Sequence, residues 1–347
     1  MHARMRLYFS MLVAASCVLV ACSDDASPSG EGGSGSSSTQ SGTAGEGSDA
    51  SGGVTTTGTT GGAEDGSMET GSEAGSDGET GGTQPADTRI AFIRQVGGGY
   101  QAFVAEADGS GEVQITDGNT STLGVAWAPD GRHLAVTDGA VLRVIEDDGA
   151  NPFDVMLPEP GIQVFRASWA PDNETLVFDA SGDIYSTIAE PGSTPTAILT
   201  LNVNSSPEWS PDGASLVYSR GLGMPAFEQD GVYLMDADGS NERIVTEVEV
   251  GQFTDATWLR DGQTLVFNDR DANGISQIYA VQSDGSDRRA LTDEPFDVVG
   301  ARRCSEADCV YVIEFGEGID NGAYRLDTNT GTLTLAVPDA ILVVTVP

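Results

Sequence analysis

Lysine is absent from this 347-residue sequence and histidine occurs twice, so two side chains much used in covalent and acid–base catalysis are missing or scarce. Without lysine, the protein cannot form a Schiff base or hold a phosphate through an ammonium group. His133 lies in a repeated motif whose other copies have Thr175 or Ser215 at the same place. We therefore interpret His133 as a substituted surface residue, expect no catalytic residues, and predict that the protein is not an enzyme.

Positive charge is also scarce. The chain has 16 basic residues against 53 acidic ones, a net charge of −37. Eleven acids lie in 23–86, which leaves 42 acids against 14 arginines and a net charge near −28 for 87–347. A surface this acidic repels phosphate backbones, so we expect no nucleic-acid partner.

Long apolar stretches are limited to Leu7–Ala21, whose fifteen residues are too few to span a bilayer comfortably. The stretch follows two arginines, which is the order of a signal peptide over 1–21. It ends in Leu-Val-Ala before Cys22, a sequence that resembles the lipobox of bacterial lipoproteins. The resemblance implies cleavage before Cys22 and lipidation of that residue. An ordinary signal peptide followed by an accidental cysteine is the alternative.

Residues 22–86 form a second region, composed almost entirely of Gly, Ser, Thr, Ala and acids after Cys22. Such a composition cannot bury enough apolar surface to offset its ordering entropy, so we expect a disordered tether. A binding tail is the alternative. Ser23 after the lipidated cysteine is compatible with sorting to the outer membrane. We therefore expect a membrane-anchored lipoprotein whose folded domain lies in the periplasm or at the cell surface.

Cys304 and Cys309 are the remaining cysteines of the folded region, in the sequence CSEADC. In an oxidising extracytoplasmic compartment, a disulfide across this short loop is the default expectation. A metal site would need more cysteine or histidine ligands than the chain has.

A ten-residue string recurs in the region 87–347. WSPDGASLVY at 209–218 returns as WAPDGRHLAV, WAPDNETLVF and WLRDGQTLVF, and each copy begins with one of the four tryptophans. In these strings Pro-Asp-Gly is a turn signal flanked by strand-forming residues, so each string predicts a β-hairpin. A second strand–turn–strand pattern follows each hairpin, as in GVYLMDADGSNERIVT. One unit therefore contains four strands, which is typical of a β-propeller blade.

Six blades are predicted by the count of these patterns. The second pattern occurs six times, but the hairpin occurs five times, including a degenerate copy at 304–313. The first unit lacks its innermost strand, while an unassigned strand, AILVVTVP, lies at 340–347. We predict an all-β, six-bladed propeller of four-stranded blades over 87–347, in which this C-terminal strand completes the first blade.

The succession W-[SA]-P-D-G, apolar strand, I/V-Y, D-G-S and R-x-L-T is similar to the TolB-type, WD40-like propeller repeat. RRALT at 288–292 and VYLMDADGSNERIVT at 232–246 are close matches. The resemblance covers nearly all of 87–347 and implies the fold; propellers serve as scaffolds, binding modules and enzyme-associated domains. TolB's N-terminal α/β domain has no counterpart here, so we expect no transfer of TolB's own partners. The tryptophans are expected to pack between blades.

A calcium loop is suggested by Asp269, Asp271 and Asn273, which have the D-x-D-x-N-G spacing of such loops. Ala280 occupies the position at which a bidentate glutamate would complete that loop. The alternative is that these residues form the hairpin between the second and third strands of a blade. We therefore expect no cofactor, with Ca²⁺ as the candidate if one binds.

The longest connection between a second and a third strand is 219–231, and such connections share one face of a propeller with the segments that enter each first strand. We call this face the loop face. The residues of this connection that we predict to bind a partner are Leu222, Met224, Phe227, Glu228 and Asp230. Exposed apolar residues favour a contact surface, although folding back over the channel mouth is the alternative.

These features predict a lipid-anchored, monomeric module of the cell envelope that binds a protein or peptide at its loop face without catalysis. Acidic residues on neighbouring loops, such as Glu317 and Asp320, would suit a basic or mixed partner. The alternative is a small-ligand sensor or enzyme that uses the propeller channel, with or without Ca²⁺.

Overall fold

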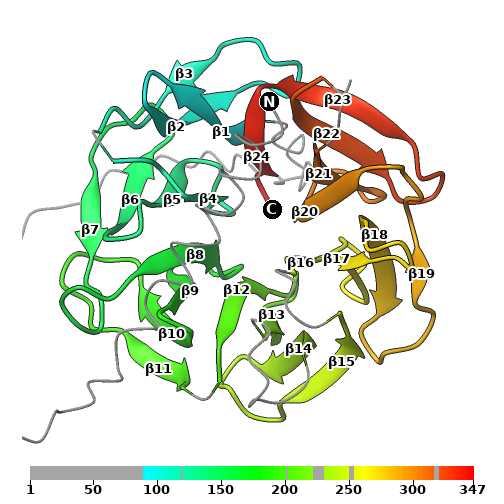
Figure 1. Ribbon diagram of the computed structural model, residues 1–347. Helices are drawn as coiled ribbons and strands as arrows, with labels where there is room; N and C mark the ends of the chain where they lie inside the picture. Colours follow the sequence, from blue (N-terminus) through cyan, green and yellow to red (C-terminus); the bar gives the residue numbers. More distant parts are fainter. Residues whose placement is uncertain (1–88, 119, 201, 222–229, 250–253, 316–319) are drawn as a thin grey trace, which may run out of the picture. The chain divides into compact units, whose positions relative to one another are not determined.

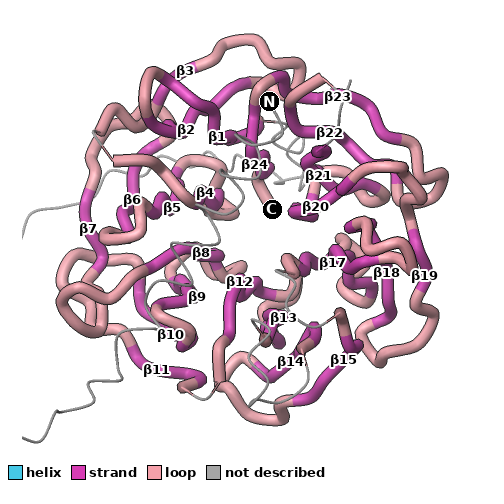
Figure 2. Tube along the Cα trace, in the orientation of Figure 1, coloured by secondary structure: helices cyan, strands magenta, loops and turns pink. Residues whose placement is uncertain are grey.

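The computed structural model describes residues 89–347 except 119, 201, 222–229, 250–253 and 316–319. The described residues form strands and turns (Figure 2). None of them belongs to a helix long and apolar enough to cross a membrane. The signal peptide at 1–21, the lipidated Cys22 and the tether at 22–86 lie outside the described residues and stay predictions.

Six four-stranded sheets are arranged around a central axis (Figure 1). The strands of blades one to three, from the inside outwards, are β24 (Ala340–Thr345), β1 (Ile90–Val96), β2 (Gly99–Ala105) and β3 (Val113–Gln114); β4 (Gly124–Trp127), β5 (His133–Thr137), β6 (Leu142–Glu146) and β7 (Phe153–Val155); β8 (Val164–Trp169), β9 (Thr175–Ala180), β10 (Asp183–Ile188) and β11 (Thr196–Leu199).

The strands of blades four to six follow the same order, and every pairing in them is antiparallel. They are β12 (Asn204–Trp209), β13 (Ser215–Arg220), β14 (Gly231–Asp236) and β15 (Arg243–Glu247); β16 (Ala256–Trp258), β17 (Thr264–Arg270), β18 (Ser276–Gln282) and β19 (Arg289–Ala290); β20 (Asp297–Arg303), β21 (Cys309–Phe315), β22 (Gly322–Asp327) and β23 (Leu333–Pro338). The predicted six-bladed, four-stranded architecture is confirmed.

The ring is closed by the C-terminal strand, as the sequence predicts. Strand β24 pairs antiparallel with β1, from Ile90 opposite Thr345 to Arg94 opposite Ala340. The first blade therefore combines residues from the two ends of the described chain. This pairing covers an edge of β1 that would otherwise expose unpaired backbone groups.

The Pro-Asp-Gly strings form the turns between first and second strands, on the face opposite the loop face. In blade three, Asp172 Oδ1 accepts hydrogen bonds from the backbone N–H groups of Glu174 and Thr175, both at 2.8 Å. The residue after the aspartate has a positive φ, as at Gly213 (φ 71°). Glycine reaches this conformation without a steric penalty, which explains why the string recurs.

Each blade packs against its neighbour through a separate apolar cluster, and the tryptophans lie in four of these clusters. Trp209 of blade four packs with Val177 and Ile184 of blade three, and Trp258 of blade five packs with Val217 and Leu234 of blade four. The expected packing of tryptophans between blades is observed. Each of the four indole N–H groups is buried without a hydrogen-bond acceptor among the described residues.

Blade six has a disulfide where blades two to five have the aspartate-containing turn of the repeated string. Cys304 and Cys309 are bonded, with their Cα atoms 5.6 Å apart, and both are buried. They join the end of β20 to the start of β21. The cross-link expected from the sequence thus replaces the turn chemistry of the other hairpins.

Two substitutions at Trp209 should separate the effect of volume from that of the indole N–H group. Trp209→Ala should lower the free energy of unfolding by about 3–5 kcal/mol, because it opens a cavity between blades three and four. Trp209→Phe should cost about 1–2 kcal/mol, because it removes less volume and a donor that has no acceptor. Urea unfolding measures both, with Ile188→Ala, at an exposed side chain, as a control of small effect. Equal losses for Trp209→Phe and Trp209→Ala would contradict this account.

Candidate functional site: the central channel

The innermost strands of the blades surround a cavity of about 90 Å³ on the propeller axis. Residue 347 lies at the centre of the ring (Figure 1). The residues that line the cavity come from all six blades: Gly124, Val125, Ala126, Trp127, Arg166, Ala167, Ser168, Trp169, Ser206, Pro207, Glu208, Ala256, Arg302, Arg303, Leu342, Val344, Thr345 and Pro347. Three arginines therefore meet on the wall of one cavity.

Besides β24, whose register against β1 shifts between Ile93 and Arg94, three innermost strands carry an irregularity in their pairing at the cavity. The register shifts between Val164 and Ala167 in β8, between Ser205 and Glu208 in β12, and between Val299 and Arg302 in β20. A bulge bends the strand and redirects the side chains within it. Arg166 and Ser206 lie in two of these bulges, and Arg302 resumes the pairing after the third.

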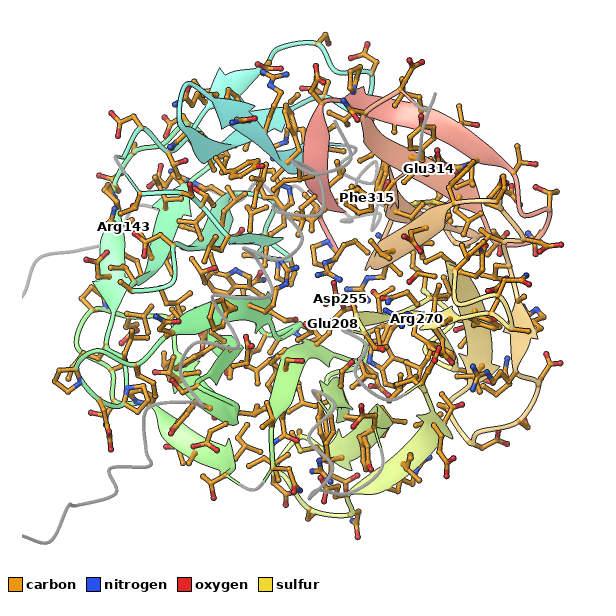
Figure 3. The ribbon with its side chains drawn as sticks, in the orientation of Figure 1. Arg143, Glu208, Asp255, Arg270, Glu314 and Phe315 are labelled. Atoms are coloured by element: carbon orange, nitrogen blue, oxygen red, sulfur yellow. A yellow bond between two sulfur atoms is a disulfide. The ribbon has the colours of Figure 1, made fainter. Side chains whose placement is uncertain are left out.

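Asp255 connects these three side chains. Its Oδ2 lies 3.1 Å from the Arg302 Nη2 and 3.7 Å from the Arg166 Nη2. The Ser206 hydroxyl donates to its Oδ1 at 2.6 Å. Burial alone would raise the pKa of Asp255, but Arg302 and Arg166 outweigh it and hold the pKa at about 2. Asp255 is thus a carboxylate at physiological pH, and Figure 3 shows it at the middle of the ring.

A second carboxylate supports the backbone of blade three behind the channel. The Asp179 Oδ1 accepts the Arg166 backbone N–H at 2.7 Å. In blade five, the Asn268 Oδ1 accepts the Asp255 N–H at 3.0 Å in the same way. Burial raises the pKa of Asp179 to about 7, against partial compensation from Arg166. An amide makes this contact without the cost of burying a charge.

Arg303 occupies the position that tryptophan has in four other blades. It pairs with Val310 as Trp258 pairs with Leu265 and as Trp209 pairs with Leu216. In the part of the chain that the structure describes, no carboxylate lies within ion-pair distance of the Arg303 guanidinium. Arg303 was not among the residues predicted from the sequence, although its place beside Cys304 in the degenerate hairpin is a signal that could have identified it. Nothing local in the sequence marks Arg166 or Asp255.

His133 is engaged in its own turn. Its Nδ1 lies 2.6 Å from the Asp130 Oδ2. At the same position in other blades, the Thr175 hydroxyl donates to Asp172 and the Thr264 hydroxyl donates to Asp261. The histidine therefore performs the contact that threonine makes elsewhere in the repeat.

The candidate calcium ligands lie on the hairpin between β17 and β18. Asp269 is buried, accepts the Glu249 and Arg270 N–H groups, and pairs with Arg288. Asp271 accepts hydrogen bonds from Asn273 and Ile275. The Asp271 oxygens support the turn itself, whereas those of Asp269 bind Glu249 of the connection before β16 and the Arg288 side chain. No group of three or more His, Cys, Asp or Glu residues suited to a metal is found in the described portion, and calcium binding stays a prediction.

Four of the five predicted partner-binding residues, Leu222, Met224, Phe227 and Glu228, lie outside the described residues. Asp230 is described and is 7% exposed, so it is buried and is not the exposed partner-binding residue that the sequence predicted. Asp230 lies just before β14, and its side chain packs directly against Gly221. The two are so close that a Cβ atom at Gly221 would collide with the Asp230 side chain. The role of the loop in partner binding stays a prediction.

Replacing Asp179 with asparagine should stabilise the protein at pH 8 and change little at pH 4. Between pH 3.8 and about 7, the folded state holds a proton that the unfolded state has released, so wild-type stability falls as the pH rises through this window. The gain from Asp179→Asn should reach about 2–4 kcal/mol above pH 7. Urea unfolding across this pH range measures it. Asp308→Asn, at an exposed position, is the control, and a gain that does not depend on pH would contradict burial as its cause.

No family model matches the sequence, and no curated protein matches it either. Solved structures do. TolB from Acinetobacter baumannii has a TM-score of 0.61 at 15% identity, with 75% of this chain and 67% of that one covered. A putative TolB from Agrobacterium tumefaciens has a TM-score of 0.56 at 19% identity, with 72% and 87% covered.

Propellers of other kinds are similar to a comparable degree. A nidogen/laminin complex matches with a TM-score of 0.59 at 12% identity, covering 74% of this chain and 97% of that one. An oligogalacturonate lyase in complex with manganese matches with a TM-score of 0.53 at 17% identity, covering 73% and 74%. At these identities the likeness establishes the fold: residues 89–347 form a six-bladed β-propeller similar to those of TolB proteins.

Proposed function

We propose that this chain is a lipid-anchored propeller of the cell envelope that binds a protein or peptide at its loop face without catalysis. The proposal rests on one observation above all: the fold is a closed ring of six blades, and its longest connection joins β13 to β14 at the loop face. The N-terminal lipobox-like sequence and tether would hold the propeller at a membrane surface. Similar propellers in TolB proteins and in a nidogen/laminin complex are consistent with a protein partner.

The charge of the loop face supports a basic or mixed partner. Exposed acids lie on the connections of several blades at this face, including Asp117, Glu159, Asp293 and Asp320. Acidic groups on the rim of an interface steer a basic partner and act mainly on the association rate. Such binding weakens as the salt concentration rises.

A second candidate function is a small-ligand sensor or an enzyme that uses the channel. The cavity that the six innermost strands enclose favours this candidate. The lyase among the similar structures shows that a propeller can serve an enzyme. For the present chain we favour binding, since His133 is engaged with Asp130 in a surface turn.

Shortening the blade-four connection should abolish partner capture. In this variant, residues 222–229 are replaced by a Gly-Ser linker of two residues, with Arg220 and Gly231 kept as strand ends. Proximity cross-linking in intact source cells, followed by mass spectrometry, measures capture against the parent chain. One envelope protein recovered with the parent and lost with the variant is the expected result. An unchanged set of captured proteins would contradict the loop-face assignment.

Neutralising two exposed acids should test the electrostatic part of the proposal. Asp117→Asn with Asp293→Asn should slow association several-fold at low salt and reduce the salt dependence of binding, because both carboxylates lie on the loop face. The matched control is Glu174→Gln with Asp308→Asn, which changes the same charge on the opposite face. Association rates with the captured partner are the measurement. If both pairs had the same effect, the net charge rather than the face would be responsible.

A further inference from the structure

Arginine is concentrated on the channel wall of a protein that is otherwise strongly acidic. Residues 87–347 contain 14 arginines against 42 acids, yet Arg166, Arg302 and Arg303 line one cavity. Like charges in a partly enclosed space repel one another more strongly than they do at an open surface. Such a concentration is unfavourable unless negative charge is present beside it.

Among the described residues, the side-chain carboxylates of the channel leave the Arg303 guanidinium without an ion pair. The Asp255 Oδ2 lies 3.1 Å from the Arg302 Nη2 and 3.7 Å from the Arg166 Nη2, so one carboxylate is shared by two guanidinium groups. Glu208, the acid on the cavity wall, accepts hydrogen bonds from the Thr257 hydroxyl at 2.9 Å and the Trp258 N–H at 3.4 Å. Within the described residues, the Arg303 guanidinium has no carboxylate at ion-pair distance.

A further arginine increases the positive potential next to Arg303. Arg260 follows the inner strand of blade five, and burial together with the charge of Arg303 lowers the pKa of Arg260. Arg302 likewise contributes, after burial, to a lowered pKa of Arg166. Arg302 and Arg166 of the channel therefore repel each other, as do Arg303 and its neighbour Arg260, and an anion beside either pair would relieve this repulsion.

The wall that carries these groups is held in place by the fold. The bulge in β20 precedes Arg302 and Arg303, and the disulfide between Cys304 and Cys309 follows them directly. The Arg302 side chain is 12% exposed and also donates to the Ala301 carbonyl oxygen at 2.8 Å. Groups held in position before binding lose little entropy when a ligand arrives.

The size of the cavity limits the ligand. One water needs roughly 10–15 Å³ of such a space. A cavity of about 90 Å³ therefore has room for roughly six to nine waters, or for a small anionic group with fewer waters beside it. Guanidinium groups match the planar geometry of a carboxylate, which accepts two parallel N–H donors.

We propose that the channel is a carboxylate-binding site in which Arg303 is the principal cation and Arg302 and Arg166 provide the surrounding positive charge. The carboxylate belongs either to a small organic acid or to a peptide that places this group in the channel. The site does not depend on the loop-face proposal, because none of these arginines belongs to the blade-four connection. Failure of one proposal is therefore distinguishable from failure of the other.

Thermal unfolding of the full chain in sodium acetate, against sodium chloride at the same ionic strength, tests the site. A ligand that binds the folded state raises the Tm according to its concentration and affinity. Acetate should raise the Tm of the parent above that in chloride. Arg303→Gln should weaken acetate binding about tenfold or more, because a charge-assisted hydrogen bond is lost. Arg303→Trp is a second variant. It places at this position the tryptophan that four other blades have there, so the blade should fold as they do.

Arg143→Gln is the matched control, since Arg143 is an exposed arginine that pairs with Asp154 away from the channel (Figure 3). It should keep the full acetate effect. The proposal would be overturned if the Tm of the parent were the same in acetate as in chloride. It would also be overturned if both Arg303 variants kept the rise in Tm that acetate causes. A short alanine peptide with a free carboxylate and its amidated form distinguish the two sources. Tighter, Arg303-dependent binding of the free form than of acetate supports a peptide, and acetate binding without a peptide effect supports a small acid.

Discussion

Contact between neighbouring blades is the interaction on which this structure depends. Six apolar clusters each join two adjacent blades, including the cluster in which Ile90 and Phe92 of blade one meet Tyr311 and Ile313 of blade six. A four-stranded sheet cannot bury both of its faces alone, so every blade needs two neighbours. The pairing of β24 with β1 supplies the last neighbour, and the ring then has no blade with an open face.

A closed ring can tolerate local departures from regular pairing at its centre. Bulges in β8, β12 and β20 give up ladder hydrogen bonds, while the apolar clusters further out remain intact. These departures bring together Arg166, Ser206 and Arg302 around Asp255, which comes just before the inner strand of blade five. The polar groups of the channel thus belong to blades that are held in place by the apolar contacts between them.

Much of the fold was predictable because its signals are local. The Pro-Asp-Gly strings predict their own turns: an aspartate that accepts from the backbone N–H groups two and three residues later and a residue with positive φ lie within five positions. The number of blades and the closing strand followed from counting such units. The burial of individual acidic residues was harder to predict from such local signals. Asp230 was predicted to bind a partner and Asp269 to be a candidate calcium ligand, but both are buried because they lie against strands of the second and third positions.

The sequence by itself determined the repeat, the turns, the ring closure and the short disulfide, because each depends on residues close together in the chain or on the count of equivalent units. Tertiary structure alone decided the channel. Arg166, Asp255 and Arg302 come from blade three, the connection into blade five and blade six, and no spacing in the sequence relates them. Their charges act through space, and the pKa of Asp255 falls to about 2 only where the ring holds two guanidinium groups beside it.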